Sequence, residues 1–264
     1  MKFFPCVYVG MLLVSLVSPL LPAATPESKN PNRFWQHVSW KTPEGVSLVG
    51  FYHPAGGAGR LTWVLLHGLG SVKEEWSDFA QQAARTLDDG FLIYDLRGHG
   101  ASTQGKPGEK LDYREWRQAG PGSPWSLMGD DLKSAVAMLM DRYHLTENRI
   151  ALGGASLGAN VSLVYAGRHQ AVPAVILLSP GLAYAGVVTP GAYRGYGQRP
   201  LFLAASPEDA DAFDTVRQFV AQRGDSNLRV ASGDGAAHGV AMAKNPVFTK
   251  KLIDWMKEMD ERRQ

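Results

Sequence analysis

A serine between two glycines is the first feature of this chain that could do chemistry. The segment Gly154-Ala155-Ser156-Leu157-Gly158 follows an apolar run that begins at Ile150. This spacing of glycine, serine and glycine is typical of a sharp strand-to-helix turn that exposes the serine hydroxyl. Glycine is required at both flanks because a larger residue would clash in so tight a turn. Ser156 is therefore the candidate nucleophile.

A serine hydroxyl is a weak nucleophile near neutral pH, so it needs a base, and the base needs an orienting carboxylate. If the order along the chain is serine, acid and histidine, the base is His169 or His238. His169 falls at the end of the helix that the turn would start. His238 follows the last predicted strand and has small neighbours, so it is the candidate base. A surface-loop histidine without a catalytic role is the alternative.

Several acidic residues between the serine and His238 could orient the imidazole: Glu208, Asp209, Asp211, Asp214, Asp225 and Asp234. The catalytic acid should follow a neighbouring strand and lie beside the imidazole. Asp209 meets this requirement because it closely follows the predicted strand at residues 200–204. Glu208 is the second choice, and the remaining acids are expected to be solvated.

An oxyanion requires two backbone N–H donors, one from the residue after the nucleophile and one from the loop after an earlier strand. Leu157 supplies the first. Leu69 supplies the second, in the glycine loop that follows the apolar run at residues 61–66. The side chain of His67 is expected to be structural. A polar turn holding Asp95, Arg97 and His99 is interpreted as scaffold, because turn hydrogen bonding accounts for it.

Strand-like and helical runs alternate after an opening hairpin at residues 37–40 and 46–52, a pattern that indicates parallel strands with crossover helices. The predicted strands are 61–66, 90–94, 150–152, 175–178, 200–204 and 228–231. The predicted helices are 73–87, 125–143, 157–168, 207–223 and 246–262. Residues 101–124 and 180–198 are predicted to be loops that wall a cleft above the strands.

Charge and cysteine content exclude several classes of protein. The 27 basic and 25 acidic residues are spread along the chain, so no basic stripe points to nucleic acid. The single cysteine, Cys6, lies in the leader, which excludes a cysteine hydrolase and a cysteine metal site. No cofactor or metal is expected, and the sequence does not indicate the oligomeric state.

The first residues resemble a secretory signal peptide. Lys2 precedes an apolar run from Val7 to Leu21, with small residues after it. We expect residues 1–24 to be removed, leaving residues 25–264 as a single catalytic domain of a periplasmic or secreted protein, without a membrane span in the mature form. An uncleaved N-terminal anchor is the alternative, although the run is short for a span.

Five motifs in this order resemble the α/β-hydrolase superfamily: His67-Gly68-Leu69-Gly70, Asp95-Leu96-Arg97-Gly98-His99-Gly100, Gly154-Ala155-Ser156-Leu157-Gly158, Ser206-Pro207-Glu208-Asp209 and Ala237-His238-Gly239. The resemblance implies an α/β fold with an eight-stranded, mostly parallel sheet, helices on both faces and no large cap domain. It also implies serine chemistry, since dehalogenases and epoxide hydrolases of this superfamily carry aspartate at the turn and dienelactone hydrolases carry cysteine.

These features predict a serine hydrolase that cleaves carboxylic esters of small or lipid-like molecules through an acyl-enzyme. A serine peptidase is a second hypothesis, because Glu74 and Glu75 could hold a peptide amine. A non-catalytic binding protein on the same fold is a third. A dinucleotide site at Gly153 and Gly154 is disfavoured because the glycine spacing departs from the phosphate-binding fingerprint. Aromatic residues that could line the substrate cleft are Trp76, Tyr113, Trp116, Trp125 and Tyr184.

Overall fold

The computed structural model describes Met1, residues 34–224 and residues 226–262. Apart from Met1, the predicted leader at residues 1–24 lies outside the described residues. From Phe34 onward the chain forms one compact unit. No helix among the described residues is both long and apolar enough to cross a bilayer.

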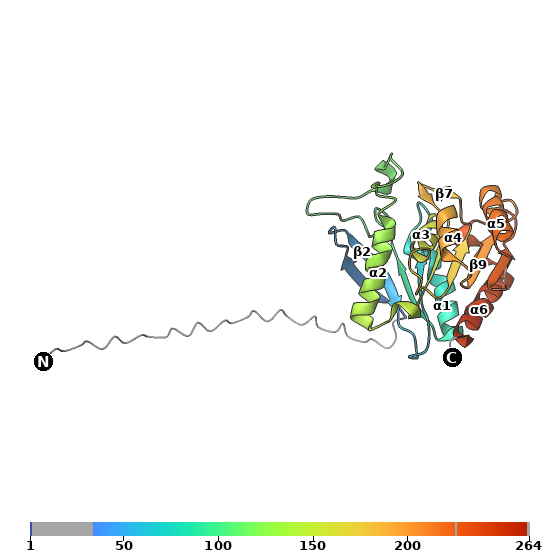
Figure 1. The fold of residues 1–264 in the computed structure, drawn as a ribbon, viewed down its shortest axis with the longest axis horizontal. Coiled ribbons are helices and arrows are strands. Elements are labelled where there is room, and N and C mark those ends of the chain that lie inside the picture. The colour runs from blue at the N-terminus through green and yellow to red at the C-terminus, as the bar shows by residue number, and fades with distance from the viewer. Residues whose placement is uncertain (2–33, 225, 263–264) are drawn as a thin grey trace. The chain divides into compact units, whose positions relative to one another are not determined.

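A mixed β-sheet forms the centre of this unit, and the helices pack against it (Figure 1). In the described residues, eight strands pair in the order β1-β2-β4-β3-β5-β6-β9-β10. β1 and β2 form the predicted antiparallel hairpin, β2 pairs antiparallel with β4, and every later pairing is parallel. The strands are β1 Gln36–Lys41, β2 Ser47–His53, β3 Thr62–Leu66, β4 Gly90–Tyr94, β5 Ile150–Ala155, β6 Val175–Leu178, β9 Leu201–Ala205 and β10 Leu228–Ser232. The expected mostly parallel sheet is confirmed.

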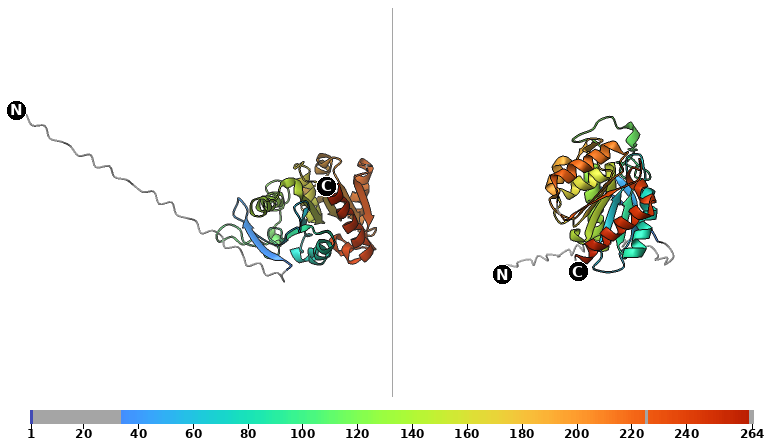
Figure 2. Two further views of the ribbon diagram at one scale, coloured as in Figure 1. Left: turned by 90° about the horizontal axis from the view of Figure 1, so that it is seen from below. Right: turned by 90° about the vertical axis from the view of Figure 1, so that its right-hand side faces the viewer.

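Helices cover both faces of the sheet, and each face has its own apolar core. α1 and α6 pack on one face with Phe79 and Leu252, and α2, α3, α4 and α5 pack on the other. The right-hand view of Figure 2 shows the two groups on opposite sides of the strands. The helices are α1 Ser77–Leu87, α2 Met128–Tyr143, α3 Leu157–Ala166, α4 Pro190–Tyr196, α5 Ala210–Gln222 and α6 Pro246–Glu261.

The central strands are buried on both faces, which explains their continuous apolar runs. In β3, Val64 and Leu66 belong to one core while Trp63 and Leu65 belong to the other. This alternation follows from the two-residue period of a strand. The alternation fixes the register of β3. The glycine loop begins at the carboxyl end of this strand.

The clearest differences between the predicted elements and the structure lie in two segments. The predicted loop at 180–198 contains a short hairpin, β7 Ala183–Tyr184 and β8 Val187–Val188, followed by α4. The predicted helix at 73–87 begins instead as a 3-10 turn, η1 Lys73–Trp76, and becomes α-helical only in α1. No large cap domain is present in the described part of the chain. The loop at 101–124 contacts the hairpin, since a Cβ built on Gly186 would lie 2.8 Å from Cβ of Ala119.

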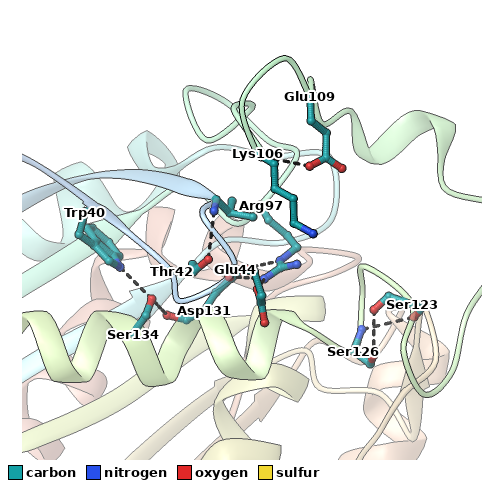
Figure 3. A network of polar contacts seen from close by, with 11 residues as sticks. Trp40, Thr42, Glu44, Arg97, Lys106, Glu109, Ser123, Ser126, Asp131 and Ser134 are labelled. Atoms are coloured by element: carbon teal, nitrogen blue, oxygen red, sulfur yellow. Dashed lines mark hydrogen bonds and ion pairs between the residues drawn. The ribbon is translucent and has the colours of Figure 1, made fainter.

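A buried ion pair ties the turn after β4 to α2, as Figure 3 shows. Arg97 Nε donates to Asp131 Oδ2 at 2.6 Å, and Arg97 Nη2 donates to Asp131 Oδ1 at 2.5 Å and to Glu44 at 3.1 Å. Trp40 donates to Ser134 of the same helix at 2.9 Å. Burial raises the pKa of Asp131 to about 6, although Arg97 opposes this rise. These contacts favour the interpretation of Arg97 as scaffold.

A second buried carboxyl group lies just before β4. Asp89 accepts a hydrogen bond from Trp63 Nε1 at 2.8 Å and has no exposed surface. Burial, together with hydrogen bonding to Asp260 and repulsion by its charge, raises the pKa of Asp89 from 3.8 to about 9. The fold therefore favours the protonated, uncharged form of the Asp89 side chain near pH 7.

Candidate active site

Ser156 lies on the corner between β5 and α3. Its backbone has φ of 53° and ψ of −118°, a conformation that costs energy for a residue with a side chain. The corner is held from both sides: Ser156 N–H donates to Leu178 O at 2.9 Å, and Asn160 N–H donates to Ser156 O at 3.2 Å. The half-buried hydroxyl is thereby raised above the end of the sheet. This is the geometry that the glycine spacing predicts.

The flanking glycines are sterically required at this corner. A Cβ on Gly154 would lie 2.2 Å from the carbonyl carbon of Gly158, and a Cβ on Gly158 would lie 2.4 Å from Leu66 O. Both neighbours are backbone atoms, which have little room to move. α3 can therefore begin close against β3 only when these positions lack side chains.

His238 lies after β10 and is paired with Asp209. His238 Nδ1 lies 2.8 Å from Asp209 Oδ2, and the Asp209 side chain is only 14% exposed. With the proton on Nδ1, the ring nitrogen Nε2 is free to accept one. Glu208 is exposed, and its carboxylate makes no hydrogen bond or ion pair with His238 among the described residues. The structure thus brings Asp209, rather than Glu208, to the imidazole.

Two serines to which the sequence analysis gave no role hold the loop that carries His238. Ser206 Oγ donates to Ala237 O at 2.6 Å, and Gly239 N–H donates to Ser179 Oγ at 2.9 Å. These bonds fix the residues on either side of His238 to the ends of β9 and β6. Both serines lie within two residues of the end of a predicted strand, which is the signal that could have identified them.

The His238 loop also packs against the serine corner. A Cβ built on Gly239 would lie 3.0 Å from Cβ of Ala155, the residue before Ser156. Ser156 and His238 line the same cavity, although no direct hydrogen bond joins their side chains in the described structure. Such bonds are commonly longer in unliganded sites and tighten when substrate binds. His169, the other candidate, lies 2.8 Å from Glu147 instead.

The predicted oxyanion donors lie next to the serine. A Cβ built on Gly68 would lie 3.5 Å from Cβ of Ser156, so the loop after β3 packs directly on the corner. Leu69 N–H donates to no acceptor in the described part of the chain. Leu157 is the first residue of α3, where a backbone N–H has no partner within the helix. Both amides are therefore available to an anion.

The buried side chain of His67 supports the loop from below. Its Nε2 accepts a hydrogen bond from Leu96 N–H at 2.9 Å, so Nδ1 carries the proton and donates to Gly68 O at 2.7 Å. Burial lowers the pKa of His67 to about 4, although the bond to Gly68 acts against this. His67 is therefore neutral and structural near pH 7, which agrees with the interpretation from sequence.

The cavity beside Ser156 has a volume of about 520 Å³. Leu69, Phe79 and Val240 give it apolar surface, and Glu75 and His238 add polar groups. None of the five aromatic residues that the sequence suggested for the cleft lines this cavity. Trp76, for example, is fully buried and donates to Leu66 O at 3.0 Å. Among the described residues, no cluster of histidine, cysteine or acidic side chains is arranged to hold a metal ion.

Comparison with known proteins identifies a family and several solved structures that are similar to this chain. A family model described as the alpha/beta hydrolase family matches residues 63–256. An esterase of Pyrococcus furiosus is similar in structure, with a TM-score of 0.65 and 19% identity over 85% of this chain and 92% of that one. A dienelactone hydrolase from Anabaena variabilis has a TM-score of 0.61 and 21% identity over 88% and 99% of the two chains.

An alpha/beta hydrolase from Penicillium is also similar, with a TM-score of 0.65 and 15% identity over 85% of this chain and 98% of that one. At these identities the likeness concerns the fold. A search by sequence among curated proteins finds no match. The family model covers most of the chain, from β3 into α6, and includes the serine corner and the loop that carries His238. The chain therefore belongs to the α/β-hydrolase family.

Proposed function

We propose that this protein is a serine hydrolase that cleaves carboxylic esters. The observation that carries the proposal is the Asp209–His238 pair, 2.8 Å apart, in the cavity that also holds Ser156. A hydroxyl, an imidazole oriented by a carboxylate and two backbone amides that have no acceptor in the described part of the chain are the parts that acyl transfer requires.

In the proposed reaction, Ser156 Oγ attacks the ester carbonyl carbon while His238 Nε2 takes the hydroxyl proton. The Leu69 and Leu157 amides hold the negative oxygen of the tetrahedral intermediate. The carbon–oxygen bond to the alcohol then breaks, and the imidazolium returns its proton to the departing alcohol. Water, deprotonated by His238, releases the acid from Ser156 in the same way. Asp209 keeps the imidazole in the tautomer that accepts at Nε2.

Small-molecule or lipid-like esters are the proposed substrates. A cavity of about 520 Å³ lies within the range of small-molecule sites. Its apolar wall at Leu69, Phe79 and Val240 suits an acyl or alkyl group. A panel of p-nitrophenyl esters with increasing acyl length would measure how long a chain this wall accepts.

The direct test is Ser156→Ala measured on a p-nitrophenyl ester. Loss of the nucleophile should lower kcat/KM at least about a thousandfold. Ser39→Ala is the matched control, because Ser39 is an exposed serine on β1 and should retain full activity. If Ser156→Ala keeps more than about one tenth of the wild-type activity, the chemistry lies elsewhere.

The two glutamates that suggested a peptidase have other partners in the structure. Glu74 pairs with Lys73 at 2.9 Å, and both carboxylate oxygens of Glu75 accept hydrogen bonds from the loop at residues 68–71. Both glutamates already accept bonds from neighbouring groups, which favours the ester proposal over the peptidase alternative. Turnover of an aminoacyl amide faster than its matched ester would overturn the preference for esters.

We also propose that the protein is exported and loses residues 1–24. The proposal rests on the sequence of the leader alone. Intact-mass measurement of protein recovered from the periplasm or culture medium tests it. A mass that includes the leader would favour the uncleaved anchor.

A further inference from the structure

Glu75 lies in the wall of the catalytic cavity, yet both of its carboxylate oxygens are bonded to the loop at residues 68–71. Oε1 accepts a hydrogen bond from Gly68 N–H at 3.0 Å, and Oε2 accepts one from the Ser71 hydroxyl. The carboxylate therefore spans the two ends of the short turn that carries Leu69. The reaction steps proposed above assign no role to this side chain.

The turn needs such a support because its own structure is weak. Leu69 is 51% exposed and lies between two glycines, of which Gly70 has φ of +76°. One backbone bond closes the turn, from Ser71 N–H to Gly68 O at 3.1 Å. Glycines allow many backbone conformations, so the peptide between Gly68 and Leu69 would rotate readily without further contacts.

The direction of the Leu69 N–H depends on the atoms of Gly68. Gly68 C=O and Leu69 N–H belong to one planar trans peptide, so they point in opposite directions. His67 and Ser71 hold the oxygen of this peptide. Glu75 holds the N–H of Gly68, which fixes the preceding peptide plane, between His67 and Gly68. With both planes held, the Leu69 N–H has one direction.

We propose that Glu75 is a positioning residue that orients the Leu69 amide toward the developing oxyanion. This inference rests on the proposed function, since it assigns Glu75 a part in the same reaction. The hydrogen bonds act as a preorganised support, so the Leu69 dipole need not be reoriented during catalysis. Burial raises the pKa of Glu75, while the bonds from Ser71 and Gly68 and the charge of His238 lower it.

The test compares Glu75→Ala with Glu75→Gln and with Asp78→Asn. Alanine removes both bonds. Glutamine can still accept from Gly68 and donate to the Ser71 hydroxyl, so it keeps the pattern without the charge. Asp78 is the control, because it lines the same cavity but has no bond to the turn among the described residues.

Glu75→Ala should lower kcat on a p-nitrophenyl ester by about 10- to 100-fold, somewhat less than complete removal of an oxyanion donor. KM should change less than about threefold, because ground-state binding does not use the oxyanion donors. The inhibition constant of a trifluoromethyl ketone, which forms an anionic adduct with serine, should rise by the same factor as kcat falls. Glu75→Gln should recover most of the activity. Asp78→Asn changes the cavity wall and not the turn, so any loss that it causes should appear in KM.

Amide hydrogen exchange at Gly68 gives a second measurement that does not require turnover. Glu75→Ala should speed this exchange, whereas Glu75→Gln and Asp78→Asn should not. Unchanged exchange in Glu75→Ala, or a kcat equal to that of the wild type, would overturn the inference. A glutamine variant as slow as the alanine variant would also overturn it, because charge rather than loop geometry would then matter. If Glu75→Ala does not fold, Ser71→Ala, which removes one of the two bonds, takes its place. A wild type without ester turnover would instead refute the proposed function, and exchange would still decide whether Glu75 holds the turn.

Discussion

Replacement of Gly158 by alanine tests the close contact between the serine corner and β3. A Cβ at this position would lie 2.4 Å from Leu66 O and 2.6 Å from His67 O. Ordinary contacts of this kind begin near 3.4 Å, so the start of α3 must move by about 1 Å, the difference between 3.4 and 2.4. The obstructing atoms are backbone atoms at the buried end of β3 and cannot rotate away.

This displacement should affect both stability and activity. Overpacking of this kind typically costs about 1–3 kcal/mol of unfolding free energy. Because Ser156 begins the same corner, its hydroxyl should move relative to His238 and Leu69. A displacement of roughly 1 Å can lower the rate about a hundredfold. We therefore expect lower kcat/KM in the folded variant as well as a lower urea midpoint.

Gly129→Ala is the matched control for this experiment. Gly129 lies in the first turn of α2, and a Cβ there would meet nothing within 4 Å. Alanine should stabilise this helix by roughly 0.5–1 kcal/mol without affecting turnover. Urea unfolding and p-nitrophenyl ester kinetics would be measured for both variants. A Gly158→Ala protein with the stability and kcat/KM of the wild type would refute the argument from packing.

Further predictions concern single carboxylates and their partners. Asp209→Asn should lower kcat/KM on a p-nitrophenyl ester roughly a thousandfold to ten-thousandfold, because the imidazole loses the correct tautomer. Glu208→Gln should stay within about twofold of the wild type. Equal losses in the two variants would refute the assignment of Asp209 as the catalytic acid. The pKa of Asp89 is raised from 3.8 to about 9 in the folded state. The contribution of Asp89 to the free energy of unfolding is therefore complete below pH 4 and is lost as the pH rises toward 9. The free energy of unfolding should fall by up to about 1.4 kcal/mol per pH unit in this range. Asp89→Asn cannot lose this proton, so its unfolding free energy should decline less than that of the wild type between pH 5 and pH 8 in urea titrations; parallel declines would contradict the raised pKa. Arg97→Ala should cost about 3–5 kcal/mol in the same assay because Asp131 is left buried without its partner, and a loss below about 1 kcal/mol would show that the pair is not buried as described.

The serine corner could be predicted because its determinants are local. Gly154, Ser156 and Gly158 encode a turn whose steric requirements act within five residues. The parallel strands were equally predictable, since buried strands such as β3 are apolar at every position. His238 and the Leu69 loop followed from their places after strands, which is where ligands bind in open α/β sheets.

Other features depend on contacts that a linear pattern does not contain. Asp209 and Glu208 are adjacent, and only the path of the chain into α5 decides which carboxylate reaches His238. Ser179 acts on Gly239, 60 residues away. The hairpin of β7 and β8 has two residues in each strand, too few to show a hydrophobic period.

Glu75 illustrates the same limit. From the sequence it is one of two acidic residues before a predicted helix, a position that the helix dipole favours. In the structure the 3-10 turn η1 precedes α1 and directs the Glu75 carboxylate back to Gly68. A helix beginning at Lys73 would not have suggested this contact.

Covalent labelling with a fluorophosphonate is the decisive experiment on Ser156, because it requires an activated serine and does not depend on knowing the substrate. We expect stoichiometric modification of the wild-type protein, mapped by peptide mass spectrometry to Ser156, and labelling that is lost in Ser156→Ala and strongly slowed in His238→Ala. Modification at another serine, or no modification of the folded wild-type protein, would contradict this expectation.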